Sequence, residues 1–103
     1  MTLTSSDHGK TVEVPLGESI TIRLPENPTT GYRWAVESIT PGHLTLNEGS
    51  FVPAADSGVG GGGFREMAVH ATQEGEGEIR LKLGQPWNDE IADRFEVRVV
   101  VRV

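Results

Sequence analysis

The 103-residue sequence contains no cysteine, few aromatic residues and no long apolar run. The absence of cysteine excludes disulfide bonds, a thiolate nucleophile and a cysteine-ligated metal site. No apolar run approaches the roughly 20 residues that span a bilayer. Nine lysine and arginine residues, against 15 acidic ones, are scattered along the chain. Nucleic acid and anionic membrane surfaces are therefore not expected as partners, because both require clustered basic residues.

The length and the N-terminus give expectations about organisation and location. Domains commonly contain about 100–150 residues, so residues 1–103 are predicted to form one domain, with residues 1–9 as a flexible tail. The first eight residues lack the basic and apolar regions of a signal peptide. We therefore expect a cytoplasmic protein as the sequence stands, or an exported one if a signal peptide has been removed.

Apolar and polar residues alternate along much of the chain, which predicts β-strands rather than helices. The clearest run is 95–103, where Phe95, Val97, Val99, Val101 and Val103 occupy every second position. Further strands are predicted at 11–14, 20–24, 32–36, 44–52, 67–71 and 79–83. Each run has one apolar face, as expected of antiparallel strands that are covered on one side.

Seven short strands in about 100 residues predict an all-β, immunoglobulin-like sandwich of mostly antiparallel strands. Turn signals separate the strands, for example Pro41-Gly42 and the Glu-Gly repeat at 74–77. Trp34, on the third predicted strand, is expected to fill the core. Since no disulfide can form, packing alone must hold the two sheets together.

Three connections with unusual compositions are predicted to share one end of the sandwich. Successive connections in an antiparallel chain alternate between the two ends, so the second, fourth and sixth lie together. They contain residues 27–32, the glycine-rich segment 56–63 and residues 84–89. Trp87 has turn residues on both sides, so it is either a binding anchor or a cap on the open end. Two other unusual loops at the same end favour binding.

These loops, in this order, resemble the chagasin family of cysteine-protease inhibitors, and the match covers essentially the whole chain. Residues 27–32, Asn-Pro-Thr-Thr-Gly-Tyr, match the family's NPTTG motif and the aromatic that follows it. Residues 58–61 match its GxGG motif, and Pro86-Trp87 match the end of its RPW motif. Gln85 stands where the family has arginine, and the glycine run continues through residues 62 and 63.

The resemblance implies reversible, competitive, non-covalent inhibition of papain-like (cathepsin L-type) cysteine proteases by a monomer. The loop at 27–32 would enter the active-site cleft as a wedge, and the other two loops would grip its sides. The implied protease-binding residues are Asn27, Pro28, Thr29, Thr30, Gly31, Tyr32, Gly58, Val59, Gly60, Gly61, Gln85, Pro86 and Trp87.

Enzyme functions find little support in the sequence. His8, His43 and His70 fall in a tail, a turn and a strand without metal-ligand spacing. There is no G-x-S-x-G elbow, and no Lys-Ser/Thr follows the glycine run as in a phosphate loop. We therefore expect no catalysis, cofactor or metal. The alternative to inhibition is an immunoglobulin-like adhesion or assembly module that binds a non-protease partner through the same loops.

Overall fold

The computed structural model describes residues 1–27, 30–40, 42–53 and 62–103, with the side chain of Glu48 excepted. These residues form eight strands and a short 3-10 helix, η1 (Ser5–Asp7). The strands are β1 (Thr2–Leu3), β2 (Thr11–Pro15), β3 (Ser19–Glu26), β4 (Arg33–Ile39), β5 (Leu44–Pro53), β6 (Gly63–Ala71), β7 (Gly75–Gly84) and β8 (Ile91–Arg102). The seven predicted strands correspond to β2–β8.

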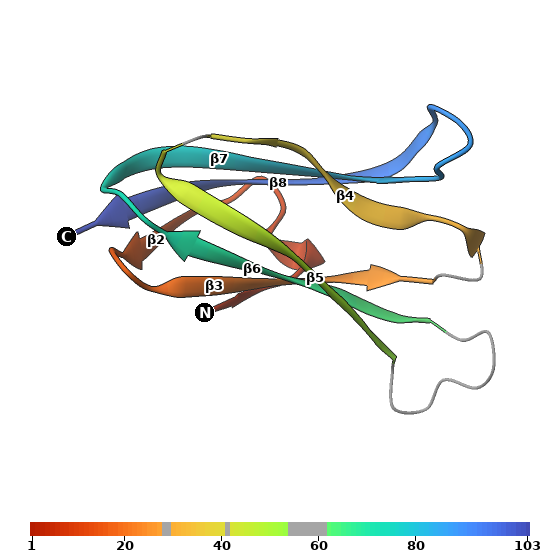
Figure 1. The fold of residues 1–103 in the computed structure, drawn as a ribbon, viewed down its shortest axis with the longest axis horizontal. Coiled ribbons are helices and arrows are strands. Elements are labelled where there is room, and N and C mark those ends of the chain that lie inside the picture. Colours follow the sequence, from red (N-terminus) through yellow and green to blue (C-terminus); the bar gives the residue numbers. More distant parts are fainter. Residues whose placement is uncertain (28–29, 41, 54–61) are drawn as a thin grey trace.

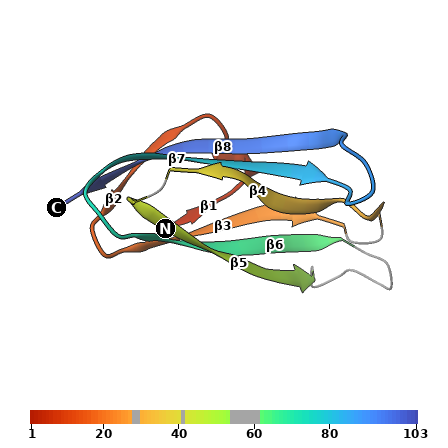
Figure 2. The same cartoon turned by 45° about the horizontal axis from the view of Figure 1, so that its top comes forward.

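The strands form two packed sheets with the orders β1-β3-β6-β5 and β2-β8-β7-β4 (Figures 1 and 2). Neighbouring strands are antiparallel except in the pairs β1–β3 and β2–β8, which are parallel. The register shifts between Val36 and Ser38 of β4 and between Asn47 and Ser50 of β5. The predicted all-β sandwich is therefore confirmed, with parallel pairing confined to the two N-terminal strands.

The N-terminal residues, which were expected to be a tail, pack on the sandwich. Thr2 and Leu3 pair with Thr21 and Ile22 of β3, and the Leu3 side chain is buried in the core. The centroid of the His8 ring lies 6.3 Å from the centroid of the Phe95 ring. These positions therefore belong to the sandwich rather than to a tail. In the described part of the chain, no helix is long and apolar enough to cross a membrane.

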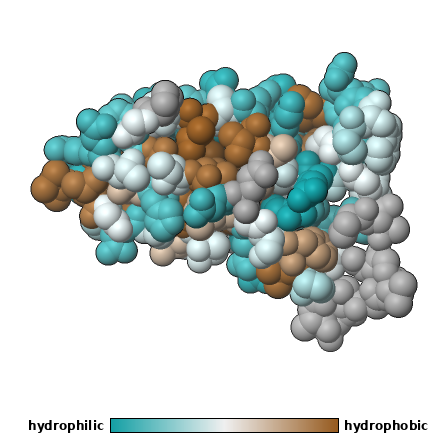
Figure 3. Space-filling view, viewed as in Figure 1, coloured by the Kyte–Doolittle hydropathy of each residue, from teal (hydrophilic) through white to brown (hydrophobic). Residues whose placement is uncertain are grey.

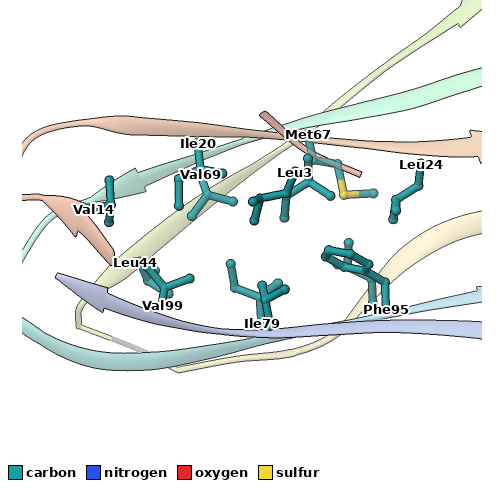
Figure 4. Packing of buried hydrophobic residues seen from close by; sticks show 14 of the residues in the cluster. Leu3, Val14, Ile20, Leu24, Leu44, Met67, Val69, Ile79, Phe95 and Val99 are labelled. Atoms are coloured by element: carbon teal, nitrogen blue, oxygen red, sulfur yellow. The ribbon is translucent and has the colours of Figure 1, made fainter. Parts of the chain in front are cut away.

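The core lies between the sheets and consists of the alternating apolar residues of facing strands (Figure 4). Ile20, Ile22 and Leu24 of β3 are at most 1% exposed. On the opposite sheet, Leu81 and Val99 are fully buried. Trp34 is also buried, as its place on the third predicted strand indicated. Period-two alternation therefore identifies the inward face of these strands, except at Val103, which follows β8 and is 91% exposed.

The connections alternate between the ends of the sandwich as predicted. In Figure 1, β3, β5 and β7 end, and β4, β6 and β8 begin, at the same side of the molecule. We call this side the loop end. The β3–β4 loop (27–32), the β5–β6 loop (54–62) and the β7–β8 loop (85–90) all start and finish there.

Truncation of the core tests the assignment of inward positions. Leu81→Ala and Val99→Ala should each lower the free energy of unfolding by about 1–4 kcal/mol, because both leave a cavity between the sheets. Chemical denaturation measures this change. The exposed neighbours Lys82 and Arg98 serve as controls, and their alanine variants should change it by about 0.5 kcal/mol or less. Unchanged unfolding midpoints for both core variants would contradict the assignment.

Candidate binding site

The β3–β4 loop makes a tight turn held by its own threonine. The backbone N–H and the hydroxyl of Thr30 both donate to the carbonyl oxygen of Asn27, at 3.2 and 2.7 Å. Gly31 follows with a φ of +80°, in the left-handed region that favours glycine. The chain then leaves through the half-buried Tyr32 into β4. A threonine and a glycine at these positions therefore support this turn directly.

The β7–β8 loop covers this turn with a tryptophan side chain. The six-membered ring of Trp87 lies so close to Gly31 that a Cβ added there would overlap the ring, with Cζ2 and Cζ3 at 3.0 and 3.1 Å. Trp87 nevertheless remains 67% exposed. The prediction that this residue points away from the core is confirmed. The ring packs on the neighbouring loop and leaves apolar surface open to solvent.

Gln85 connects the same two loops through polar contacts. Its Nε2 donates to the carbonyl oxygen of Thr30 at 3.0 Å, and its Oε1 accepts a hydrogen bond from Asn88 Nδ2 at 2.7 Å. Asn88 Oδ1 in turn accepts from the backbone N–H of Glu90 at 2.9 Å. The position at which the family has arginine is therefore occupied here by a side chain that bonds within the protein.

A hollow of about 910 Å³ lies between the β3–β4 and β7–β8 loops. Tyr32, Pro86 and Trp87 contribute to its walls from the loops, and Ala35 and Lys82 from strands β4 and β7. On the face drawn in Figure 3, apolar surface gathers where β4 ends and β5 begins, whereas the region of the β7–β8 loop is pale to teal. The exposed Trp87 therefore lies apart from that apolar surface, beside Tyr32, Pro86 and Ala35 in the wall of the hollow.

Two charged residues that sequence analysis did not single out lie at the base of the loops. Glu26 ends β3 and is 5% exposed. Its Oε1 bonds Arg65 Nη2 at 2.7 Å, while its Oε2 accepts from Arg65 Nε at 3.2 Å and from the backbone N–H of Trp34 at 2.9 Å. The Trp34 indole N–H donates to the carbonyl oxygen of Pro25 at 2.8 Å. Both charged residues continue an alternating pattern, two positions after Leu24 and two before Met67.

Of the predicted site residues, the structure brings Thr30, Gly31, Gln85 and Trp87 into direct contact. Asn27 and Tyr32 lie half-buried at the two ends of the β3–β4 loop, and Pro86 is exposed beside Trp87. Across the described ranges, no three histidine, aspartate or glutamate side chains are placed to hold a metal ion. The predicted residues that lie outside the described ranges are Pro28, Thr29, Gly58, Val59, Gly60 and Gly61.

The contact between Gly31 and Trp87 is testable with a matched pair of glycines. Gly17, in the turn at the opposite end, has a φ of +89° and no atom within 4 Å of an added Cβ. Gly17→Ala should therefore cost only the left-handed backbone penalty, about 1–2 kcal/mol. Gly31→Ala should cost more, because its methyl group also displaces Trp87.

The extra cost should disappear in a Trp87→Ala background, as a double-mutant cycle on the free energy of unfolding would measure. Equal costs for Gly17→Ala and Gly31→Ala, in both backgrounds, would show that the ring does not rest on Gly31.

The sequence is similar to known proteins along most of its length. Residues 13–99 match the model of the family described as chagasin family peptidase inhibitor I42. The chain is 36% identical over 103 residues to Amoebiasin-1 of Entamoeba histolytica, covering 99% of this chain and 100% of that one. It is 32% identical over 101 residues to chagasin of Trypanosoma cruzi, covering 92% of each.

A solved structure shows the same fold. The crystal structure of the cysteine protease inhibitor EhICP2 from Entamoeba histolytica aligns with a TM-score of 0.85 at 27% identity, over 98% of this chain and 94% of that one. The family match, the two relatives and this structure agree over nearly the full length of the chain. The chain belongs to the chagasin family of peptidase inhibitors.

Proposed function

We propose that this protein is a reversible, competitive, non-covalent inhibitor of papain-like cysteine proteases of the cathepsin L type. The observation that carries the proposal is the joining of two family-motif loops into one surface, through Trp87 on Gly31 and Gln85 on Thr30. The relative EhICP2 is itself described as a cysteine protease inhibitor. We assign protease contact to residues 27–32, 58–61 and 85–87.

The β3–β4 loop is proposed to enter the active-site cleft as the wedge. A loop that is already folded loses less conformational entropy on binding, which favours affinity. The bonds from Thr30 to the Asn27 carbonyl and from Gln85 to the Thr30 carbonyl supply this order. None of these residues is an electrophile, so the catalytic cysteine stays chemically unmodified and inhibition reverses on dilution.

The other loops are proposed to hold the protease on either side of the wedge. Trp87 offers a large, rigid apolar surface, of the kind that anchors many protein interfaces. Gln85 carries no charge and is already bonded to Thr30 and Asn88. Affinity should therefore depend on the Trp87 contact more than on long-range charge attraction, and inhibition should vary little with salt.

Added bulk at Thr30 tests the wedge. Thr30→Trp should raise the inhibition constant for a papain-like protease at least tenfold, about 1.4 kcal/mol, because a large side chain cannot enter the cleft. The matched control is Thr72→Trp, at an exposed threonine in the turn at the opposite end, which should inhibit like wild type. Circular dichroism checks that both variants are folded. If the folded Thr30→Trp variant inhibited as strongly as wild type, this loop would be excluded as the wedge.

Removal of the anchor tests the second loop. Trp87→Ala should raise the inhibition constant by a factor that corresponds to about 2 kcal/mol or more, mainly through faster dissociation. Leu16→Ala is the control, because Leu16 is also exposed and apolar but lies at the opposite end. Inhibition constants and dissociation rates measure both.

Two results would count against the proposal. If Trp87→Ala and Thr30→Trp both inhibited like wild type, the loop end would not be the inhibitory surface. If the wild-type protein inhibited no papain-like protease, the adhesion or assembly module would replace the inhibitor as the proposed function.

A further inference from the structure

We propose that Glu26 and Arg65 are positioning residues for inhibition, whose buried ion pair fixes the strand ends that present the β3–β4 and β5–β6 loops. The inference rests on the proposed function, since it concerns how the same loop end is made ready for a protease. It assigns a role to two side chains that lie next to the proposed contact residues and belong to none of the three loop motifs.

The pair joins the strands from which two loops extend. Glu26 is the last residue of β3 and directly precedes the β3–β4 loop, while Arg65 is the third residue of β6 and follows the β5–β6 loop. The two strands are antiparallel neighbours, with Glu26 opposite Gly63 and Leu24 opposite Arg65. Two hydrogen bonds connect the carboxylate and the guanidinium, so both the distance and the orientation of the side chains are fixed.

The same carboxylate also reaches the other sheet. Glu26 Oε2 accepts a hydrogen bond from the backbone N–H of Trp34, the second residue of β4. The Trp34 indole N–H donates in the reverse direction, to the carbonyl oxygen of Pro25 on β3. Glu26, at one end of the β3–β4 loop, therefore contacts Trp34 beyond the other end of that loop and Arg65 on the strand that follows the β5–β6 loop.

The burial of this pair sets it apart from the other ion pairs. The Glu26 and Arg65 side chains are 1% and 11% exposed, whereas both partners of every other pair in the described ranges are at least 22% exposed. Exposed pairs contribute little to stability. Buried pairs are expensive to desolvate, and replacing one with apolar residues is often neutral or stabilising.

Stability alone therefore gives weak grounds for charges at these two inward positions. Apolar side chains there would extend the rows that end at Leu24 and Met67. A charged pair adds what apolar packing lacks, namely directional bonds that hold strand ends in one arrangement. Glu26, Arg65 and Trp34 also line the hollow between the loops, together with Tyr32 and Trp87. The directional bonds thus lie directly beneath the surface proposed to meet the protease.

The decisive experiment separates stability from inhibition. In the double variant E26L/R65M, apolar side chains replace the pair, and we expect a folded protein whose free energy of unfolding falls by no more than the cost of leaving the Trp34 backbone N–H without an acceptor. The inhibition constant for papain should nevertheless rise at least tenfold, because Trp34 loses its acceptor and the loops lose their common attachment. Amide hydrogen exchange in residues 27–34 of the free protein should become faster.

The matched control removes an exposed pair. E13Q/R102M breaks the contact between β2 and β8, where Arg102 Nη2 lies 2.9 Å from Glu13 Oε1 and both side chains are more than 60% exposed. Stability, inhibition and loop exchange should all remain at wild-type values. In R65K the charge is kept but the two-pronged geometry is lost, and the inhibition constant should rise by a smaller factor than in the double variant.

The outcomes distinguish this inference from the proposed function. Folded E26L/R65M that inhibits and exchanges like wild type would overturn the positioning role. If the double variant does not fold, R65K provides the test. A folded R65K variant with the inhibition constant and the amide exchange rates of wild type would overturn the positioning role. If wild type itself inhibits no papain-like protease, the proposed function fails. Unchanged exchange in the variants would then also exclude the pair as the attachment of the loops.

Discussion

Without a disulfide, the two sheets of this protein are held together by contact between inward-facing side chains, and the rest of the structure depends on that contact. Along most of the sandwich these side chains are aliphatic, such as Ile22 and Val99, and apolar packing is strong but not directional. At the loop end the rows of aliphatic residues finish at Leu24 and Met67. There the contact between the sheets changes character, because hydrogen bonds from Trp34 to Glu26 and Pro25 cross from one sheet to the other.

The change matters because the loop end must hold its loops in position as well as hold the sheets together. Apolar packing tolerates small shifts of one strand against another, and a shift at the base of a loop is carried to its tip. The bonds around the Glu26 carboxylate restrict such shifts at the base. Further out, Gln85 and Trp87 connect the β7–β8 loop to the β3–β4 loop. Order at this end therefore comes from two levels of contact, one buried and one near the surface.

The sequence predicts the strands of the sandwich well because the pattern that defines a strand lies in consecutive residues. Period-two alternation identifies most of the strands from β2 to β8 and their inward faces, and strand-forming residues identify the irregular β5. The alternation of connections places three loops at one end. The strand β1 was missed because two residues carry no periodicity, and only pairing with β3 reveals it. Glu26 and Arg65 were missed although the alternating pattern extends to both, since a charged residue at an inward position is usually interpreted as the end of a strand. The bond from Gln85 to Thr30 joins residues far apart in the chain, and no sequence pattern indicates it.

The same contacts explain why a neutral residue is suited to position 85 in this chain. An arginine there could donate to the Thr30 carbonyl, but it has no acceptor atom for the Asn88 amide that now bonds Gln85 Oε1. Glutamine provides a donor and an acceptor at once, and so continues a chain of bonds from Thr30 through Asn88 to the backbone of Glu90. Glutamine at position 85 therefore lacks the surface charge of arginine but adds hydrogen bonds that order the β7–β8 loop. That order places Trp87, which is the residue most able to contribute apolar contact with a partner.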